Sequence, residues 1–503
     1  MIEGLLSAAA DLLTWPGPPL ILAGVLIGLF VGVLPGLGGS AGMALLLPLT
    51  FGMSSTHGIA FLMAIGTSSG LGGQITSILV SIPGDPPNAV TTIDGYQMTR
   101  QGKAAEALGA ATFGSIFGAV FGVVFFLALL PFARSLVLAV SYPEFFMVAL
   151  VGLLLIAATT GGSFLKGFTA VGAGLLVSFI GLDPVVGNPR FTFGQLYLWD
   201  GIDIVPALIG LFAGAEMLAL FSQRGMHGIA ELHALDRGSR MIDGLWSTIR
   251  AWKIVLVSSA IGFIAGIIPG ISGTLASFLA YGQAKRMSAH PEEFGRGSVE
   301  GVIAPETAND SDKGGAMLPT LAFGIPGGVM WAVLLAGLLI QGVPAGPNLL
   351  RGDLHIVYVV VIAALIPRLI AAALVLLVGD RAVGITRTRG DVLAPLIAIV
   401  AVVGVYALRN EMLDVVVLLA FGYVGYAMQA YGFSRLGFII ALVLGGLIES
   451  SFHQTLATFG PSGLVTRPLT LVLLVVSVII VALPASAAIR RIIASRRATG
   501  AAS

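Results

Sequence analysis

The chain has 503 residues, of which 56% are hydrophobic and only 10% are charged. Soluble proteins carry about 25% charged residues, so this chain cannot cover a water-facing surface of its size and must present most of its surface to lipid. Lys and Arg number 26 against 25 Asp and Glu, and this net charge of +1 offers no polybasic surface to nucleic acid. The sequence has no Cys, which excludes disulfides, thiolate metal sites and thiol catalysis. A soluble enzyme, a nucleic-acid-binding protein and a disordered scaffold are thereby excluded.

The distribution of basic residues indicates the topology. Glu3 and Asp11 are the only charges before the first apolar run, Leu20–Leu34, so a basic signal-peptide region is lacking and the run is expected to be retained. No Lys or Arg precedes Arg100, and basic residues favour the cytoplasmic side, so the N-terminus is expected outside. Four arginines in the tail, residues 490–503, predict a cytoplasmic C-terminus. This arrangement requires an odd number of crossings, and roughly 11 to 13 helices fit the length.

We expect an all-α polytopic membrane protein with two membrane repeats, residues 1–223 and 254–489. The polar stretch 224–253 carries five basic residues and is expected to be a cytoplasmic linker between them. The clearer spans, in chain order, are Leu108–Pro131, Phe145–Ala158, Phe168–Leu182, Ile204–Phe221, Ile356–Val378, Val392–Leu408, Leu413–Met428, Leu436–Ile448 and Leu469–Ile489. No G-x-x-x-x-G-K-[ST] motif is present, so energy would not come from a nucleotide bound to this chain.

Two segments of the chain repeat in the same order. Gly28–Gly39 aligns with Gly262–Gly273 at an offset of 234 residues, with five of twelve positions identical, all of them Gly or Pro. A second break, Ile-Pro-Gly, follows at Pro83 and again at Pro326. The separation between the two breaks grows from 48 to 57 residues, which we attribute to an inserted loop around residues 288–313. The preserved order predicts an internal duplication.

The charge map predicts that the two repeats are inverted. The first pair of short helices, Leu20–Leu34 and Ala41–Phe51, lies in the region free of Lys and Arg, whereas basic residues flank the second pair, Ile254–Ile268 and Thr274–Gln283. Arms of this length make roughly 16 to 22 Å of helix, less than the ~30 Å hydrocarbon core. Each pair therefore reads as a re-entrant hairpin with its Pro-Gly tip near mid-membrane, one entering from each side. This is a recurrent design of secondary transporters.

Interrupted helices suit the binding of a small anion together with a cation. Pro stops a helix and Gly permits the turn that follows, which frees backbone groups that lipid cannot satisfy. The helix start after each break offers N–H groups to an anion, and freed carbonyls can coordinate Na⁺. The alternative is close helix packing by small residues. The candidate substrate-binding residues are Pro35, Gly36, Gly38, Gly39, Ser40, Pro83, Gly84, Gly270, Ser272, Gly273, Thr274, Asn309, Pro326 and Gly327.

Polar residues beside the second pair of breaks are candidates for the coupling ion, Na⁺ or H⁺. They are Asp85, Thr76, Asn88, Glu306 and Asp310. The last two precede Gly314-Gly315, taken as the break of the second repeat, and the alternative for them is a polar loop. Glu216 and Arg368 lie inside predicted spans, where a charge either serves function or is hydrated or paired structurally. No cofactor, metal site or catalytic residue is predicted.

Several longer motifs resemble the large membrane subunit of the tripartite tricarboxylate transporters (TctA type). They are Pro35–Gly39, Gly72–Gly84, Thr91–Tyr96, Phe294–Gly297, Glu300–Asn309, Phe323–Gly327, Gly342–Pro347 and Leu444–Glu449, and the resemblance covers roughly residues 20–475. It implies a multi-pass protein of the bacterial inner membrane with two partners, a small membrane subunit (TctB type) and a periplasmic solute-binding protein (TctC type). It further implies uptake of carboxylates such as citrate, driven by an ion gradient.

Two residues depart from the pattern of that family. Asp310 stands where a second Asn is common, and Asp85 where a small polar residue often follows Pro-Gly. Both add negative charge near an expected anion site. Either they bind the coupling cation, or the substrate differs from citrate.

Two other functions compete with transport driven by an ion gradient. Gly270-Ile-Ser272-Gly273 fits the nucleophile turn of an intramembrane serine protease, but no His lies in a clear span to act as its base. A passive anion channel is the other alternative. Accumulation of substrate against its gradient separates a transporter from a channel.

Overall fold

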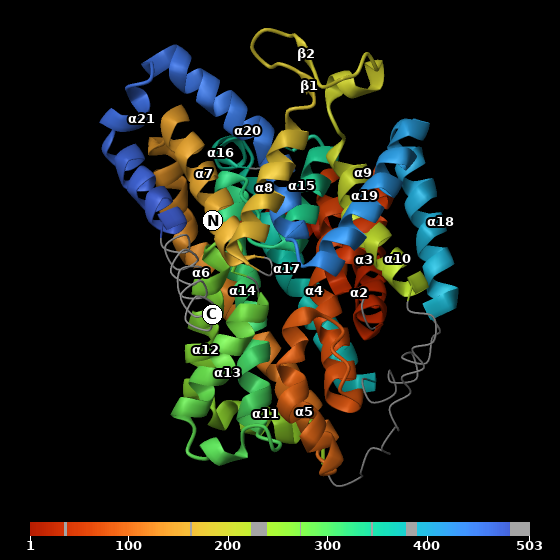
Figure 1. The fold of residues 1–503 in the computed structure, drawn as a ribbon. Helices are drawn as coiled ribbons and strands as arrows, with labels where there is room; N and C mark the ends of the chain where they lie inside the picture. The colour runs from red at the N-terminus through yellow and green to blue at the C-terminus, as the bar shows by residue number, and fades with distance from the viewer. Residues whose placement is uncertain are drawn as a thin grey trace, which may run out of the picture. The chain divides into compact units, whose positions relative to one another are not determined.

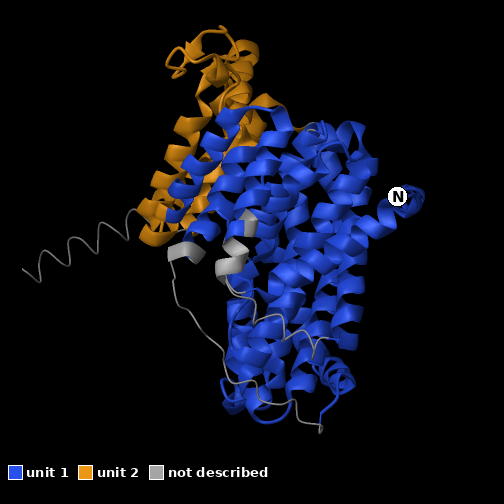
Figure 2. Ribbon diagram, turned by 90° about the vertical axis from the view of Figure 1, so that its right-hand side faces the viewer, with its two compact units in different colours: residues 1–138, 205–426 blue, residues 139–204, 427–503 orange. Residues whose placement is uncertain are grey.

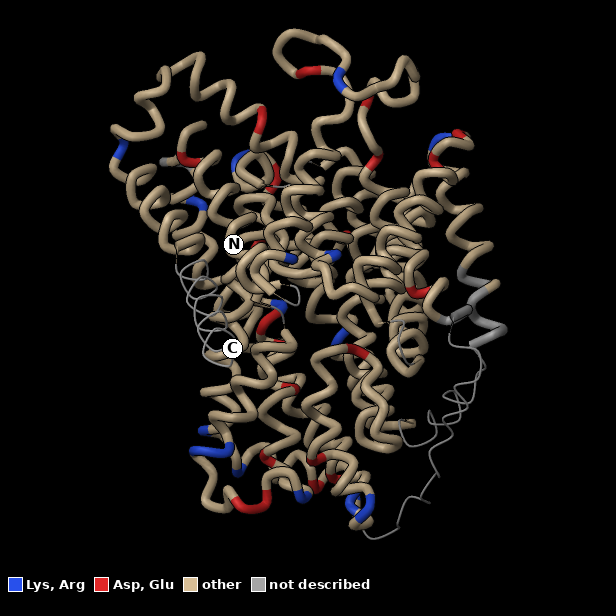
Figure 3. Tube along the Cα trace, viewed as in Figure 1, with Lys and Arg blue, Asp and Glu red and all other residues tan. Residues whose placement is uncertain are grey.

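The computed structural model describes residues 1–34, 38–160, 163–222, 239–271, 273–343, 346–378 and 390–482 (Figure 1). Most of these residues are helical, and the described strands are β1 (Gly181–Leu182) and β2 (Pro189–Arg190), which form an antiparallel pair of two residues each. The predicted all-α polytopic class is confirmed. Charged residues are sparse along the helices, as expected for a chain that faces lipid (Figure 3).

Among the described residues, six helices are long and apolar enough to cross a membrane. They are α4 (Ser55–Val80), α6 (Ala104–Ala139), α7 (Tyr142–Thr159), α17 (Leu354–Val378), α19 (Met412–Tyr431) and α20 (Arg435–Phe459). Two pairs bent by 83° raise the number to eight, namely α1 (Ile2–Leu13) with α2 (Gly17–Val33), and α11 (Met241–Arg250) with α12 (Trp252–Ile267). The long helices thus do not reach the expected 11 to 13 crossings, because many apolar helices have only 10 to 17 residues.

The remaining elements of the described chain are mostly short. They are α3 (Gly38–Leu46), η1 (Leu47–Thr50), η2 (Pro86–Ala89), α5 (Thr91–Arg100), α8 (Phe164–Ser178), η3 (Leu196–Asp200), α9 (Ile204–Ile209), η4 (Gly210–Gly214), α10 (Ala215–Ser222), α13 (Gly273–Met287), η5 (Pro291–Glu293), α14 (Val299–Phe323), α15 (Val329–Ile340), α16 (Pro347–Gly352), α18 (Gly390–Arg409) and α21 (Gly463–Thr466). The exceptions are the polar helix α14, with 25 residues, and α18, with 20 residues. A further apolar helix covers Pro468–Ala482.

The chain divides into two compact units (Figure 2). Unit 1 comprises residues 1–138 and 205–426, and unit 2 comprises residues 139–204 and 427–503. This division cuts across both predicted repeats, since each contributes helices to each unit. The repeat boundaries therefore stay a prediction, and the tail 490–503 lies outside the described residues. All the described candidate site residues belong to unit 1.

Unit 2 is held by charge-assisted contacts between distant parts of the chain. Arg190 on β2 binds Glu449 on α20 through both guanidinium nitrogens, at 2.5 and 3.0 Å, and Arg467 binds Glu144 at the start of α7. In the β1–β2 turn the backbone N–H groups of Val186 and Val185 hold the pKa of Asp183 below its ordinary value. The turn and α20 are thereby fixed to one another within the unit.

Unit 1 contains the same helix packing twice. A Cβ on Gly32 in α2 would collide with the carbonyl oxygen of Ser69 in α4, and a Cβ on Gly266 in α12 would collide with that of Asp312 in α14. Gly28 and Gly262 approach α4 and α14 in the same way, one turn earlier. The glycines on α2 and α12 are 234 residues apart in the sequence, and the residues that they meet on α4 and α14 are 243 residues apart. G-x-x-x-G spacing thus brings the same two backbones together in each half.

The second breaks also pack alike. A Cβ on Gly84 would meet the carbonyl oxygen of Gly32, and a Cβ on Gly327 would meet Ala316 and the carbonyl oxygen of Gly266. Each break follows a helix that ends in a left-handed residue, Ser81 after α4 and Gly324 after α14. After each of these breaks the chain packs closely against a helix, α2 in the first half and α12 in the second half.

The structure corrects the loop expected over residues 288–313. The connection ends at Ser298, whose Oγ caps α14 by accepting from the Gly301 N–H at 3.4 Å. Glu306 and Asp310 therefore lie inside a buried helix, and Gly314-Gly315 is mid-helix rather than a break. The charges of Glu306 and Asp310 favour a hydrated loop when the sequence is considered alone. In the structure these carboxylates have hydrogen-bond or ion-pair partners on other helices, which allows them to be buried.

The expected cytoplasmic linker 224–253 stays a prediction. Residues 223–238 lie outside the described residues, but Met241–Arg250 forms α11 and α12 begins at Trp252. α11 precedes α12 as α1 precedes α2, with the same 83° bend.

One buried carboxylate fixes the start of α14 to the first half of the chain. Asp94 on α5 is fully buried, and its Oδ1 accepts from the backbone N–H groups of Gly295, Gly297 and Ser298 at 2.8, 2.8 and 2.9 Å. Its Oδ2 accepts from the Tyr281 hydroxyl at 2.8 Å. Two of the motifs singled out in the sequence, Thr91–Tyr96 and Phe294–Gly297, thus form one contact that positions α14.

Replacement of Asp94 by Ala should lower the free energy of unfolding by about 3 kcal/mol, because three backbone N–H groups and the Tyr281 hydroxyl lose the carboxylate that accepts from them. Thermal unfolding of the purified chain in detergent measures the loss. The exposed Glu292→Ala variant is the control and should shift stability by less than about 0.5 kcal/mol. Equal melting temperatures for the two variants would contradict the role of Asp94.

The close helix approach predicts opposite effects for two glycines. Gly266→Ala should destabilise the protein by about 1 to 3 kcal/mol, because its Cβ would meet a backbone carbonyl. Gly172→Ala in α8 has nothing within 4 Å and should be neutral or stabilising by up to about 1 kcal/mol. Thermal unfolding of both variants checks the order, and a Gly266→Ala variant as stable as Gly172→Ala would refute the packing.

Candidate functional site

At the first break, an internal carboxylate occupies the helix start. α2 ends at Val33 and α3 begins at Gly38, while Pro35 and Gly36 lie outside the described residues. The backbone N–H of Gly39 donates to Asp85 Oδ1 at 3.0 Å, and the Ser69 hydroxyl donates to Oδ2 at 3.2 Å. Asp85, predicted as an ion ligand, thus lies where the helix dipole favours an anion. Ser40 is half-buried in the first turn of α3.

At the second break, two polar side chains face the start of α13. Ser272 lies outside the described residues, and Gly270 has a left-handed φ of 88°. A Cβ on Gly273 would lie 2.7 Å from Asn309 Oδ1 and 3.2 Å from Asp312 Oδ2. Thr274 follows, half-buried. Asp312 was missed from the sequence, although the 243-residue offset aligns it with Ser69 at the first break.

The two breaks adjoin through the segment that follows Pro83-Gly84. Asp85 in this segment contacts Gly39 of the first break, and a Cβ on Gly273 of the second break would lie 3.6 Å from Pro87. Pro83 is exposed and Pro326 is buried, so the second breaks differ in their surroundings. The interruptions of both halves thus share one polar region of unit 1.

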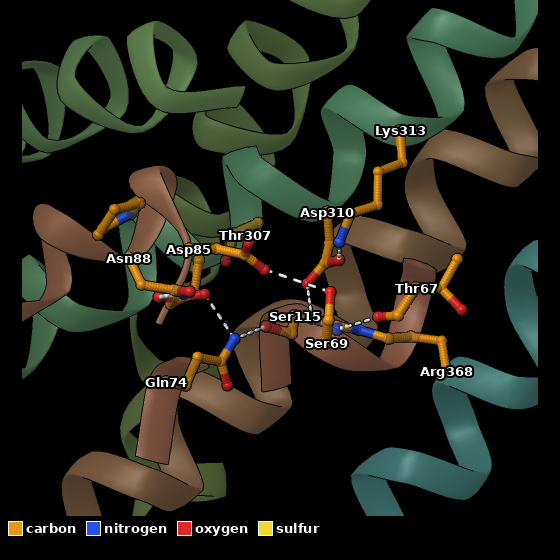
Figure 4. Close-up of polar contacts among 12 residues, drawn as sticks. Thr67, Ser69, Gln74, Asp85, Asn88, Ser115, Thr307, Asp310, Lys313 and Arg368 are labelled. Carbon is orange, nitrogen blue, oxygen red and sulfur yellow. Dashed lines mark hydrogen bonds and ion pairs between the residues drawn. The ribbon is translucent and has the colours of Figure 1, made fainter. Parts of the chain in front are cut away.

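Glu306 lies at the centre of a buried polar cluster next to this region. Its carboxylate is 1% exposed and accepts from Gln74 Nε2 at 2.5 Å, from Asn88 Nδ2 at 3.0 Å and from the Thr91 hydroxyl. Gln74 also donates to Ser115 Oγ on α6 at 2.6 Å (Figure 4). All the donors come from the first half of the chain. Thr76, by contrast, bonds within α4 to the Gly73 carbonyl at 3.0 Å.

A second cluster pairs two cations, Arg368 and Lys313, with the carboxylate of Asp310. Arg368 on α17 is 1% exposed, binds Asp310 Oδ2 and donates to the Thr67 carbonyl at 2.6 Å. Lys313 binds Asp310 Oδ1 at 2.6 Å and keeps 17% of its side chain exposed (Figure 4). Asp310 is thus neutralised by two cations, and the three groups carry +1 together. Lys313 was missed from the sequence because it was assigned to a loop.

These cations line a small cavity of unit 1. The cavity has about 10 Å³, room for about one water molecule, and is lined by Thr67, Ala119, Val123, Asp310, Lys313, Gly314, Met317, Ala364 and Arg368. A Cβ on Gly70 would lie 3.5 Å from Arg368 Nη1, 3.5 Å from Lys313 Nζ and 3.8 Å from Asn309 Nδ2. Because Gly70 has no side chain, three donors face an open stretch of backbone. Donors of this kind bind carboxylates, whereas the cavity in this structure has room for about one water molecule.

Glu216 was also singled out in the sequence. It is half-buried on α10. His453 lies within α20, beyond the predicted span Leu436–Ile448. Its Nε2 lies 4.0 Å from Glu449 Oε1 in unit 2.

Together these observations define a polytopic membrane protein with paired helix interruptions and buried charge at their junction, an arrangement found in secondary transporters. The profile of the Tripartite tricarboxylate transporter TctA family matches residues 19–440, and the chain belongs to this family. It is 32% identical over 470 residues to an uncharacterized 52.8 kDa protein in the TAR-I ttuC' 3'region of Agrobacterium vitis, covering 92% of both chains. An uncharacterized protein in the TAR-II ttuC' 3'region of the same organism is 29% identical over 195 residues, covering 39% of this chain and 81% of the relative. No solved structure gives a significant match.

The buried ion pair predicts strong coupling between two variants. Asp310→Asn should cost about 3 to 5 kcal/mol, because it leaves the buried Arg368 without its carboxylate partner. Arg368→Met should cost less than Asp310→Asn, because Lys313 still pairs with Asp310. The double variant should lose less than the sum by about 1 to 3 kcal/mol. Unfolding measurements on the four chains give the coupling energy.

The exposed pair Arg240 and Asp243, 77% and 35% exposed, is the matched control and should show coupling below about 0.5 kcal/mol. Additive losses at Arg368 and Asp310 would mean that the pair is not formed.

Proposed function

We propose that this chain is the permease subunit of a three-component secondary transporter that imports a small carboxylate, driven by a Na⁺ or H⁺ gradient. The observation that carries the proposal is the junction of two helix breaks beside a buried cluster that contains two cations, Arg368 and Lys313. In the proposed system a small membrane subunit (TctB type) and a periplasmic solute-binding protein (TctC type) complete the transporter in the bacterial inner membrane. The N-terminus is outside and the C-terminus is cytoplasmic. The substrate is a tricarboxylate such as citrate or a related organic acid.

The substrate site follows from the groups that face Gly70. Lys313 and Arg368 supply positive charge, and the Asn309 amide supplies a neutral donor. Asp310 pairs with both cations, and we propose that a substrate carboxylate competes for them. Charge-assisted hydrogen bonds of this kind contribute about 1.5 to 3 kcal/mol each.

Asp85 competes with the substrate for the backbone N–H at the start of α3. Its carboxylate holds the Gly39 N–H, which is the group that a substrate anion would use at the start of α3. Binding of a cation or proton by Asp85 would weaken that hold and free the helix start. Substrate and coupling ion would then enter together, as import driven by an ion gradient requires.

Lys313→Gln should reduce carboxylate uptake by about 10- to 100-fold, the factor that corresponds to one lost charge-assisted hydrogen bond. The assay uses proteoliposomes with all three components, with substrate varied and a Na⁺ or H⁺ gradient imposed alone. Lys285→Gln removes the same charge from an exposed position on α13 and should transport normally.

Normal uptake by Lys313→Gln would refute the site. Failure of the wild-type chain to accumulate substrate above its outside concentration would instead indicate a passive channel. Full uptake by Ser272→Ala would exclude a protease that uses this serine.

A further inference from the structure

We propose that the Glu306 centre binds one dehydrated Na⁺. We define this centre as Glu306 with Gln74, Asn88, Thr91 and Ser115. The inference names an ion for the coupling role proposed above and rests on that function only for this role. Binding of Na⁺ itself can be measured on the purified chain without transport.

The charge of the centre fits a monovalent cation. Glu306 is 1% exposed and the four surrounding side chains are fully buried. Among the described residues, the hydrogen bonds to its carboxylate come from neutral groups only, two amides and a hydroxyl. A buried carboxylate without a counter-charge is costly, and one Na⁺ would balance it. The described residues contain no group of three or more acidic or His side chains, which a divalent site usually needs.

The centre also contains more oxygen atoms than its hydrogen bonds use. Gln74 Oε1 and Asn88 Oδ1 are both buried without a partner, although each amide nitrogen donates to Glu306. Leaving a buried acceptor unpaired costs about 1 to 3 kcal/mol for each group. A half-turn of each amide about its last side-chain bond exchanges nitrogen and oxygen and points both oxygens at the carboxylate.

With the amides turned, the centre offers up to six oxygens to one ion. Two come from Glu306, two from the amides, and two from the hydroxyls of Thr91 and Ser115. Oxygen ligands of this kind suit a hard cation. A proton on Glu306 would also cancel the charge, but its single O–H could satisfy only one of the two amide oxygens. Na⁺ satisfies both, and for this reason we favour it.

The centre lies where an ion could act on the substrate site. Glu306 and Asp310 are four residues apart on α14, so they are neighbours on one helix face. The ligands other than Glu306 come from α4, η2, α5 and α6 in the first half of the chain. A bound Na⁺ would therefore tie α14 to the first half of the chain, one turn from the cluster of Arg368 and Lys313.

The test is thermal unfolding of the purified full chain in NaCl, KCl or choline chloride at equal ionic strength. Na⁺ should raise the melting temperature of the wild-type chain in a concentration-dependent manner, and K⁺ should have much less effect. Titration calorimetry should give one Na⁺ for each chain. Glu306→Gln should abolish both responses. Ser311→Ala is the matched control, because Ser311 is equally buried on α14 but donates to the Ser259 carbonyl.

Gln74→Met keeps the length of the side chain and should weaken Na⁺ binding at least tenfold, which gives a second measurement if Glu306→Gln does not fold. A Glu306→Gln chain that folds and responds to Na⁺ as the wild type does would overturn the site. So would a wild-type chain that shows no difference between Na⁺ and K⁺. Uptake driven by a proton gradient without any Na⁺ binding would refute this site and leave the proposed function intact.

Discussion

The bilayer offers no hydrogen-bond partner to a helix that stops within it, and the rest of this structure depends on how that constraint is met. At the start of α3 the Gly39 N–H finds Asp85, and at the start of α13 the side chains of Asn309 and Asp312 lie beside Gly273. Both solutions place carboxylates where helix dipoles favour them. Polar groups that surround helix ends in this way are also groups that can bind a small anion.

The same constraint explains why α14 is long, polar and buried. The helix contributes Glu306 to one cluster and Asp310 and Lys313 to the other. Asp310 pairs with Arg368 on α17 and with Lys313 on α14 itself, and Glu306 accepts hydrogen bonds from neutral donors of the first half of the chain. Asp94 fixes the start of this helix from α5. Structural contacts and candidate site residues therefore share one framework, in which α14 is held by the first half at several points.

The helix breaks could be predicted from the sequence because Pro and Gly act locally. The expected ends at Leu34 and Ile268 lie one residue beyond the observed ends of α2 and α12. The surroundings of α14 could not be predicted in this way, since a charged residue looks solvated until its partner is known. Arg368 lies 58 residues from Asp310, and Gln74 lies 232 residues from Glu306. Asp312 could have been found by applying the 243-residue offset to Ser69.

The central claim is that both helix breaks face one wet pocket that holds a small acid. Because the chain has no Cys, Ser40→Cys and Thr274→Cys place one thiol at each break without background. Labelling by a hydrophilic thiol reagent, with and without the transported carboxylate, tests the claim most directly. The account predicts that both thiols react and that the same carboxylate protects both. Two inert thiols, or protection at one break alone, would contradict it.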